Sequence, residues 1–518
     1  MKRLSLLLGM LLGMAVLVGT VVFTSPYASP VLPCPENIED LWAIEDARQE
    51  SEKPLVAALQ NGGVPLCYDA QENTFYCTLG LECGDEWPQL QLTAPGARGV
   101  SLVFSDDYSY DWCSDAVAEG YPYQILTYTD DAYFYTQIVF TGLPMISLKT
   151  DAAIGLEDTP ARFSISTPGA SAQAAAYTHL RGAGSLALSD KKSYKIDFGA
   201  PGETRQIDVP GVGAADDLIL LAGVMDDSLM RDRLSWDIYA MIADPQESYG
   251  PRDVQYAELF INDRYAGVYM MMQPVDDGEE LGKRGAEAAM TTSVYRTAQS
   301  AYAGERPYVP NDVREDSIYE VYHAPSAEHA FAALEDWLTL ERMPEGEEHD
   351  AAFIALAEKC VNVDSLVRYY LFVQAGGMSD NVFNNMYVIA GKRSGAGYAF
   401  APWDMDLTWG RFKDAETGEI YQGLFSFPVA ARMLRLNAGG AAQSLVKQWA
   451  AMRETVLTEE NVRALVEGYM HELSASGAYI RNSLRWRDDA YPADGEEIFA
   501  FCADRFRVLD EAFAAYAQ

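Results

Sequence analysis

The chain has 518 residues, enough for two or more domains with large cores, and nearly half of them are apolar. Acidic residues outnumber basic ones by 76 to 38, which gives a formal net charge of −38. A surface of this sign repels nucleic acid and anionic lipid headgroups, so we exclude both as partners. It also repels ATP, except where a local basic group offsets the field.

The first residues, 1–30, have the pattern of an export segment. The basic Met1–Arg3 precedes an apolar run, Leu6–Phe23, that is long enough to span a bilayer. Small residues suited to cleavage follow at Ser25 and Ala28–Ser29. A signal peptide and an uncleaved membrane anchor therefore both stay open, with length favouring the anchor. On either alternative we expect an exported protein, extracellular or anchored on the outer face of the cytoplasmic membrane.

The cysteines concentrate near the N-terminus, where five of the seven precede residue 114. In an exported protein this clustering predicts one or two disulfides, although spacing does not determine their pairing. A zinc site is the alternative, but the chain has no CxxC pair and no histidine before His179. We therefore expect disulfides or free thiols in this region.

Residues 31–150 are expected to form a β-rich domain. After a helical lead over 31–60, short runs of strand-forming residues alternate with turn residues, which favours a small β-sandwich. Its tyrosines and tryptophans are assigned to sheet packing in preference to a carbohydrate-binding face. The predicted strands are Phe75–Leu79, Leu90–Leu92, Gly99–Phe104, Tyr123–Tyr128 and Ala132–Phe140.

A glycine-containing turn followed by lysines comes next. After strands at Arg162–Ser166 and Thr178–Arg181, joined by an Ala/Ser-rich loop, the turn RGAGS leads into KKSYKIDF. In a strand Ser193–Phe198, Lys195 shares a face with Asp197, and Lys192 lies on the opposite face. Such a turn with lysines can bind phosphate. The alternative is a plain turn with solvated lysines at a sheet edge.

Apolar spacing then predicts a helix over Ser228–Ile242, with Asp226 and Arg231 bracing its start. A hairpin of Tyr256–Ile261 and Tyr265–Met272 follows. Residues 276–350 are rich in Asp, Glu and Gly and are expected to be an acidic insertion with two short helical patches.

A helix over Ser365–Ala375, capped by Asp364 and ended by Gly376–Gly377, should place Asp380 on a loop. The rest of the chain, about 415–518, is expected to be a helical tail.

Acids and amides gather around a predicted hairpin of Met386–Ala390 and Tyr398–Trp403. If the hairpin is symmetric about Ser394–Gly395, Asn385 lies opposite Asp404, about 5 Å away. Oxygen ligands of this kind suit Mg²⁺. The alternative is that the acids accept backbone N–H bonds in a turn. The residues concerned are Asp380, Asn384, Asn385, Asp404 and Asp406.

Taken in chain order, these blocks resemble the CotH kinase family of atypical kinase-like proteins. The resemblance covers about 155–415, with a helical tail of the family's general type beyond it. It implies an α+β protein in which a kinase-like two-lobed domain with a helical C-terminal part, 151–518, follows the β-rich domain. The matching segments are RGAGS…KKSYKIDF (181–198), LLAGVMDDSLMRDRL (220–234), AELFINDRYAGVYMMMQPVD (257–276), SDNVFNNMY (379–387) and APWDMDLTWG (401–410).

The family resemblance also implies a catalytic and metal-binding set. Asp380 matches the family's catalytic aspartate, and Asp404 matches its metal-binding aspartate. Asn385 and Asp406, which match the Asn before an aromatic strand and the second acid of W-D-x-D, complete the expected metal site. The implied cofactors are ATP and Mg²⁺, or Mn²⁺ in its place.

For the nucleotide, the resemblance implies an aromatic stacked on adenine and a lysine at the phosphates. Tyr398 stands at the position of the family's stacking aromatic, often Trp, and Tyr269 is the candidate for the opposite face of the base. Either Lys192 or Lys195 would neutralise the phosphates. Gln273 departs from the family, which commonly has Glu there as a partner for the lysine.

The implied activity is an exported kinase that phosphorylates Ser or Thr of surface, extracellular or spore-coat proteins. Its partners would be ATP and those protein substrates, with an N-terminal membrane anchor as a further expectation. The alternative is a non-catalytic pseudokinase that takes part in cell-surface or spore-coat assembly. Gln273 and the acidic field favour this alternative.

Overall fold

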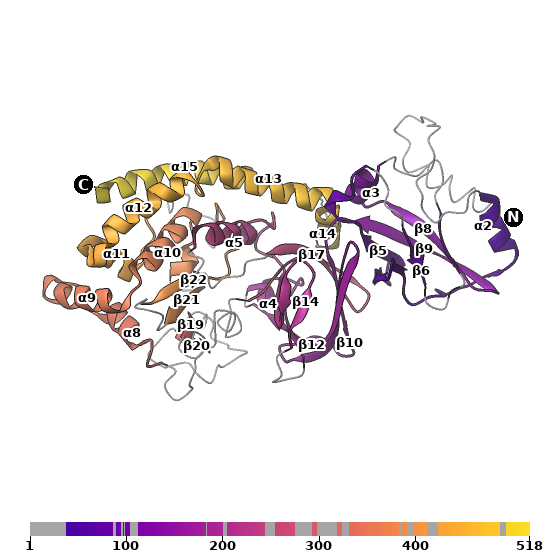
Figure 1. The fold of residues 1–518 in the computed structure, drawn as a ribbon, viewed down its shortest axis with the longest axis horizontal. Helices are drawn as coiled ribbons and strands as arrows, with labels where there is room; N and C mark the ends of the chain where they lie inside the picture. The colour runs from indigo at the N-terminus through magenta and orange to yellow at the C-terminus, as the bar shows by residue number, and fades with distance from the viewer. Residues whose placement is uncertain are drawn as a thin grey trace.

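The computed structural model places an N-terminal mixed sheet at one end, a closed barrel in the middle and a helical part at the other end (Figure 1). The expected export segment lies outside the described residues. Within them, no helix is long and apolar enough to cross a membrane. The described residues are 38–85, 90–94, 97, 99–103, 112–182, 184–199, 205–243, 254–274, 293–297, 319–323, 331–382, 385–390, 397–411, 423–486 and 494–517.

The N-terminal part has a six-stranded mixed sheet packed with a short three-stranded sheet, a more unequal pair than the small β-sandwich that was expected. Its central strand β9 pairs antiparallel with β8 but parallel with β5 and β1, a pairing that alternation of residues cannot reveal. Helix α3 and a short three-stranded sheet cover one face of it. The elements are α2 (Ile38–Asp46), β1 (Gln49–Glu50), β2 (Gln60–Asn61), β3 (Val64–Pro65), β4 (Cys67–Asp69), β5 (Thr74–Thr78), β6 (Leu92–Thr93), β7 (Gly99–Val103), α3 (Cys113–Glu119), β8 (Pro122–Tyr128) and β9 (Ala132–Thr141).

The helical lead is shorter than expected, because the described helix ends at Asp46. The expected disulfides are also not formed among the described cysteines, which are all free thiols. Cys83 and Cys113 nevertheless contact each other, and this thiol–thiol hydrogen bond lowers the pKa of Cys83 to about 7. Of the two expectations for this region, disulfides or free thiols, the structure therefore has free thiols, two of which are neighbours.

The barrel closes through seven strands in the order β10-β11-β12-β13-β16-β18-β17. Its core contains Ile146, Phe163, Ile196, Leu218 and Met271. The strands are β10 (Met145–Thr150), β11 (Thr159–Thr167), β12 (Ala170–Arg181), β13 (Ser193–Phe198), β16 (Asp217–Leu221), β17 (Gln255–Ile261) and β18 (Tyr265–Met272).

Two features of the barrel differ from expectation. The barrel begins at Met145, before the expected boundary at residue 150. The Ala/Ser-rich stretch predicted as a loop is the first half of β12, paired with β11 from Thr159↔Thr178 to Thr167↔Ala170. Tertiary pairing thus overrides the weak strand propensity of alanine and serine.

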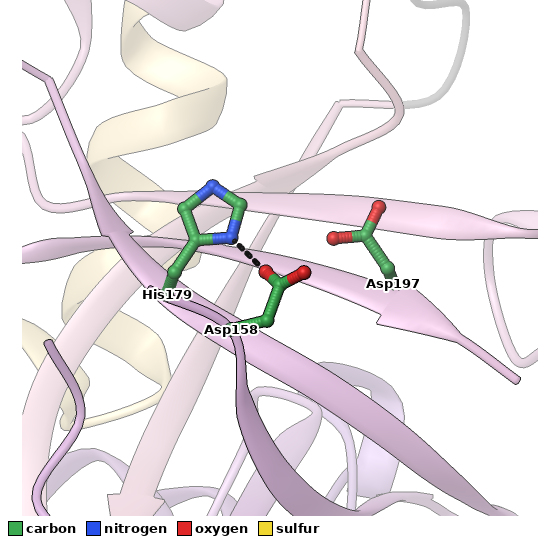
Figure 2. A group of neighbouring side chains, drawn as sticks. All are labelled: Asp158, His179 and Asp197. Carbon is green, nitrogen blue, oxygen red and sulfur yellow. Dashed lines mark hydrogen bonds and ion pairs between the residues drawn. The ribbon is translucent and has the colours of Figure 1, made fainter. Parts of the chain in front are cut away.

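The outer face of β12 and β13 carries a small polar cluster (Figure 2). His179 Nδ1 lies 2.9 Å from an oxygen of Asp158, and Asp197 lies nearby on β13. Lys195 shares this face, with its ammonium 3.1 Å from Asp197 Oδ1, as the strand periodicity predicts.

The helical part is built around a four-stranded sheet in the order β20-β19-β21-β22. Residues 276–350, expected to be an insertion with helical patches, supply β19 and β20 to this sheet. The sheet strands are β19 (Ser293–Thr297), β20 (Tyr319–His323), β21 (Met386–Ala390) and β22 (Ala399–Pro402). The helices are α5 (Arg231–Ile242), α8 (Glu335–Arg342), α9 (Glu347–Cys360), α10 (Val363–Gly376), α11 (Pro428–Leu436), α12 (Ala441–Glu454), α13 (Glu459–Ala475), α14 (Ala478–Trp486) and α15 (Glu496–Ala514).

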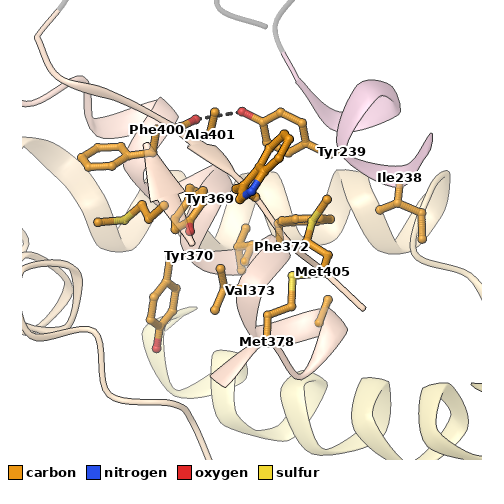
Figure 3. Close-up of a cluster of buried hydrophobic side chains, with 14 of the residues drawn as sticks. Ile238, Tyr239, Tyr369, Tyr370, Phe372, Val373, Met378, Phe400, Ala401 and Met405 are labelled. Carbon is orange, nitrogen blue, oxygen red and sulfur yellow. Dashed lines mark hydrogen bonds between the residues drawn. The ribbon is translucent and has the colours of Figure 1, made fainter. Parts of the chain in front are cut away.

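Helices α5 and α10 pack against β22 in the largest apolar core (Figure 3). The hydroxyl of Tyr239 on α5 donates to the Phe400 carbonyl of β22 at 2.8 Å. Outward-facing residues of the barrel, including Ile219 and Met270, belong to the same core. Barrel and helical part are therefore joined by packed apolar surface.

Two helix starts differ from prediction. Asn362, rather than Asp364, caps α10, since its side chain accepts from the Ser365 N–H at 3.1 Å. Helix α5 begins at Arg231 rather than Ser228, because Leu229 has a left-handed φ of 61°. A helix cannot continue through that conformation.

A buried ion pair joins the N-terminal sheet, the barrel and the helical tail. Glu258 of β17 is fully buried, and Arg481 of α14 binds both its oxygens, at 2.8 and 2.9 Å. The Thr141 hydroxyl at the end of β9 donates to the same carboxylate, as does Tyr265. One carboxylate therefore bonds to groups from three parts of the chain.

Replacing Arg481 by Met should lower the free energy of unfolding by roughly 3–5 kcal/mol, since Glu258 would stay buried without its cation. Urea denaturation measures this loss. Arg507→Met is the control, because Arg507 is 61% exposed and its pairs on α15 should contribute less than about 1 kcal/mol. Equal, small losses in both variants would contradict the structural role of the Glu258 pair.

Candidate functional site

The loop that carries Asp380 is fixed by the end of α10. Gly377 takes the left-handed conformation, φ 68°, and ends the helix. A 3₁₀ turn, Ser379–Val382, then presents Asp380. Its neighbour Asn381 is buried and donates to the carbonyls of Asn385 and Trp403, at 3.0 and 2.7 Å. Asn381 therefore ties the Asp380 loop to both strands of the hairpin, a role that the sequence analysis missed.

The hairpin register is one residue away from the prediction. Met386 pairs with Pro402, and the Trp403 N–H donates to the Asn385 carbonyl at 2.9 Å. Asn385 therefore lies opposite Trp403 rather than Asp404. The prediction assumed an even number of residues in the connection, whereas the observed pairing requires an odd number.

A slip of one residue normally sends a side chain to the other face of a sheet. Here Asn385 and Asp404 both leave the strand conformation, with φ of 49° and 55°. Asn385 Nδ2 lies 3.1 Å from Asp380 Oδ2, and the Asp380 charge acts on Asp404. Asp380 thus interacts with both Asn385 and Asp404, although Asn385 and Asp404 are not the directly paired residues that were expected.

Asp232, which the sequence analysis did not single out, adds a further carboxylate. It is buried on the first turn of α5 and accepts the Met405 N–H at 2.8 Å. Burial, and next the charge of Asp404, raise the pKa of Asp232 to about 8. The segment LLAGVMDDSLMRDRL contained this residue, but nothing in it distinguished Asp232 from its neighbours.

The pKa values of Asp404 and Asp406 are raised as well. For Asp404 burial is the main cause, opposed by Arg181 and reinforced by Asp380. For Asp406 burial is again first, followed by repulsion from Asp404 and Asp232. Both side chains remain partly accessible. Without a bound cation, this group of carboxylates therefore favours protonation.

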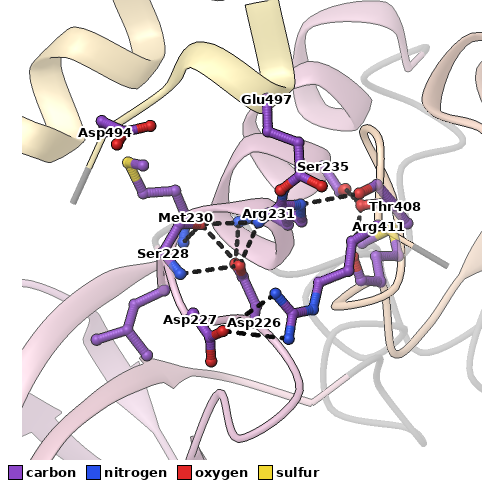
Figure 4. A network of polar contacts seen from close by, with 12 residues as sticks. Asp226, Asp227, Ser228, Met230, Arg231, Ser235, Thr408, Arg411, Asp494 and Glu497 are labelled. Carbon is purple, nitrogen blue, oxygen red and sulfur yellow. Dashed lines mark hydrogen bonds and ion pairs between the residues drawn. The ribbon is translucent and has the colours of Figure 1, made fainter. Parts of the chain in front are cut away.

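Asp226 and Arg231 brace the start of α5, as expected (Figure 4). Arg231 is buried, with Nη1 2.6 Å from Asp226 Oδ1 and Nη2 2.5 Å from Glu497. Its Nε donates to the Thr408 carbonyl at 3.0 Å. This guanidinium holds the loop after Asp406 against α5 and α15.

The two lysines expected at the phosphates bond elsewhere in this structure. The Lys192 ammonium donates to the Leu186 carbonyl at 2.9 Å and to the Ser189 carbonyl, closing the short helix Gly184–Leu188. Lys195 bonds Asp217 at 3.0 Å in addition to Asp197.

The two aromatics expected at adenine are covered by protein. Tyr398 is 5% exposed, packs against Trp337, and donates its hydroxyl to the Ala333 carbonyl at 2.6 Å. Tyr269 is 1% exposed inside the barrel. Neither ring offers a face for stacking, which speaks against both as adenine-binding residues. The covering of Tyr398 comes from α8 and the turn before it, which composition alone did not place there.

The residues at the hairpin fit a divalent cation of a particular kind. Among the described residues, the only three His, Cys, Asp or Glu side chains with ligand atoms all within 4.8 Å of one another are Asp158, His179 and Asp197. The described carboxylates at the hairpin therefore do not form a group of three with that close spacing. Mg²⁺ commonly binds through one or two carboxylates and completes its shell with phosphate oxygens and water. Asp404, Asp406 and the Asn385 amide oxygen are donors of the right chemistry for that arrangement.

The polar cluster on the barrel is explained without a metal. Asp158 is bonded to His179, and Asp197 is paired with Lys195, whose charge would oppose a cation. We assign this cluster to the stability of the strand faces.

The family model for CotH kinase protein matches residues 178–509, which is more than half of the chain. This chain belongs to the CotH kinase family. The match starts in β12 and ends in α15. It therefore contains the helical tail and the carboxylate group formed by Asp232, Asp380, Asp404 and Asp406. Membership makes the chain a kinase-like protein of mixed α and β structure. A search of curated proteins found no match.

Metal-free protein should lose stability as pH rises from about 4 to about 8. The folded-state pKa of Asp232, about 8, lies above the unfolded value, so the folded state holds a proton that unfolding releases. The contribution of Asp232 to the free energy of unfolding is therefore fully present below the pKa of the unfolded state. It is lost as the pH rises through the pKa of the folded state. Asp404 and Asp406 act in the same direction.

Denaturation with chelator present, at pH 5, 6.5 and 8, measures this loss in the wild type and in Asp232→Asn. The variant should show a shallower decline with pH, and Asp504→Asn, at a residue 86% exposed, should follow the wild type. Parallel curves for wild type and Asp232→Asn would contradict the assignment.

Proposed function

We propose that this protein is an exported kinase that transfers the γ-phosphoryl group of ATP to Ser or Thr hydroxyls of surface, extracellular or spore-coat proteins. The observation that carries the proposal is the convergence of Asp380 and Asp404. They come from separate segments, the charge of Asp380 acts on Asp404, and they match the positions of the family's catalytic and metal-binding acids. The basic and apolar residues of the first 30 positions motivate the location.

The proposed roles divide between the two ends of the hairpin site. Asp404, Asp406 and Asn385 would hold Mg²⁺ or Mn²⁺. When bound, the ion would neutralise charge on the phosphate oxygens. Such an ion also removes the need for the carboxylates to take up protons. The raised pKa values of Asp404 and Asp406 are what this arrangement would produce in its absence.

Asp380 suits the acceptor side of the reaction. Its side chain is partly exposed on the 3₁₀ turn and is oriented by the Asn385 amide. The acceptor hydroxyl oxygen attacks the γ-phosphorus, the bond to the β,γ-bridging oxygen breaks, and ADP leaves with that electron pair. The hydroxyl proton passes to the Asp380 carboxylate.

Two observations favour the alternative of a non-catalytic surface or coat protein. Gln273 donates to the Ala214 carbonyl at 3.0 Å and has no carboxylate to offer a lysine. The aromatic rings expected at adenine are buried. A protein that retains the acid group but does not transfer phosphate would keep metal binding and lose turnover.

Substituting Asp380 or Asp404 by Asn should lower phosphoryl transfer by roughly 100-fold or more, because each removes a charge that acts in the transition state. Transfer of labelled γ-phosphate by the purified full chain, with Mg²⁺ or Mn²⁺, measures this. Asp504→Asn removes an exposed charge of the same sign and should keep full activity. A wild type that binds nucleotide but transfers nothing would establish the non-catalytic alternative.

Saturation with Mg²⁺ or Mn²⁺ at pH 8 should raise the free energy of unfolding, by about 2.7 kcal/mol at 100 times the dissociation constant. Asp404→Asn should abolish this gain because it removes a proposed ligand. Asp158→Asn alters the barrel cluster and should retain the gain. The reverse pattern, loss in Asp158→Asn alone, would move the metal site to the barrel.

A further inference from the structure

Arg181 is the last residue of β12 and pairs with Ser193 at the start of β13. Alternation along β12 places it on the outer face with His179, since Ala176 and Leu180 pack in the barrel core. On the same barrel, outward-facing residues of β16, β17 and β18 pack against the helical part. Arg181 thus stands at the end of the barrel that meets the hairpin.

The guanidinium of Arg181 lies over the ring of Trp403, 5.0 Å from its centroid. Trp403 directly precedes Asp404 and is itself held firmly. Its backbone bonds Asn385 and Asn381, and its ring packs edge-on against Trp236 and Tyr387. A guanidinium stacked on a fixed ring loses few conformations when it binds a ligand.

The charge of Arg181 reaches the acid group. It opposes the rise in pKa of Asp404, and it acts in the same sense on Asp232. A cation of the barrel therefore faces carboxylates of the helical part.

Three other basic residues of this region bind protein groups. Arg231 is buried between Asp226 and Glu497, and the Lys192 ammonium bonds carbonyls of its own turn. Lys195 bonds two carboxylates on the barrel surface. These contacts hold the three cations in structural positions.

We propose that Arg181 binds the phosphates of a nucleoside triphosphate and holds them beside Asp404. The inference rests on the proposed function and names a phosphate-binding residue for it in place of the lysines. A guanidinium binds two phosphate oxygens at once, with a geometry that an ammonium lacks. In a chain of net charge −38, ATP requires a local cation of this kind.

The test compares the affinity of the full chain for MgATP and for adenosine, by calorimetry. Arg181→Ala should weaken MgATP binding by roughly 10- to 100-fold, the range of one or two charge-assisted hydrogen bonds, and adenosine binding by less than about threefold. Arg181→Lys keeps the positive charge but not the guanidinium that can bind two oxygens at once. Its MgATP affinity should lie between those of the wild type and Arg181→Ala. Arg162→Ala, at an exposed arginine of the adjacent strand β11, should resemble the wild type.

An unchanged MgATP affinity in Arg181→Ala overturns the inference, and so does an equal loss for MgATP and adenosine, which would indicate a packing role beside Trp403. In either case, phosphoryl transfer by the wild type would leave the proposed function standing. Conversely, selective loss of MgATP binding in Arg181→Ala by a chain that transfers no phosphate supports the inference and rejects the kinase. A wild type that binds no MgATP overturns both.

Discussion

Mutual repulsion among carboxylates is the constraint on which the site depends. The charge of Asp404 raises the pKa of Asp232, and both charges raise the pKa of Asp406, to which Asp226 and Asp380 add. Different contacts stabilise the individual carboxylates. Arg231 neutralises Asp226 from within the core, the Met405 N–H binds Asp232, and Arg181 attracts Asp404 from the barrel. The remaining excess of negative charge is what a divalent cation with its phosphates would balance.

The backbone conformation at the site is itself energetically unfavourable at two residues. Left-handed conformations in residues other than glycine are unfavourable, at about 1–3 kcal/mol each, and persist only where surrounding contacts enforce them. Asn385 and Asp404 both adopt them, and Asn381 bonds the carbonyls that flank them. Buried apolar residues around Phe400 and Met405 pack against the hairpin strands β21 and β22. The strain thus lies at the residues proposed to bind metal, and the rigid core beside them sustains it.

Local patterns predicted much of this protein, and long-range relations explain most of the errors. The hairpin strands, several of the barrel strands and the tail helices follow from alternation and helical periodicity, and the family resemblance pointed to Asp380 and Asp404. The one-residue register error arose because symmetry of a turn is not encoded in its residue types. Tyr398 was expected to be accessible, but the turn before α8, which bonds its hydroxyl, comes from an insertion whose composition gave no sign of that contact. Asp232 and Arg181 gain their significance only from the docking of α5 and β12 near the hairpin.

That docking also determines how Arg181 and Asp404 can act together. Arg181 belongs to the barrel and Asp404 to the helical part, so their separation is set by the interface between the two. Ile219 and Met270 on the outer barrel face belong to the same apolar core as the helices. Because cores of this kind are packed closely and resist deformation, the separation is fixed by packing rather than by a hinge. Met270→Ala should therefore weaken the MgATP binding proposed for Arg181, as measured by calorimetry, although Met270 is an apolar core residue.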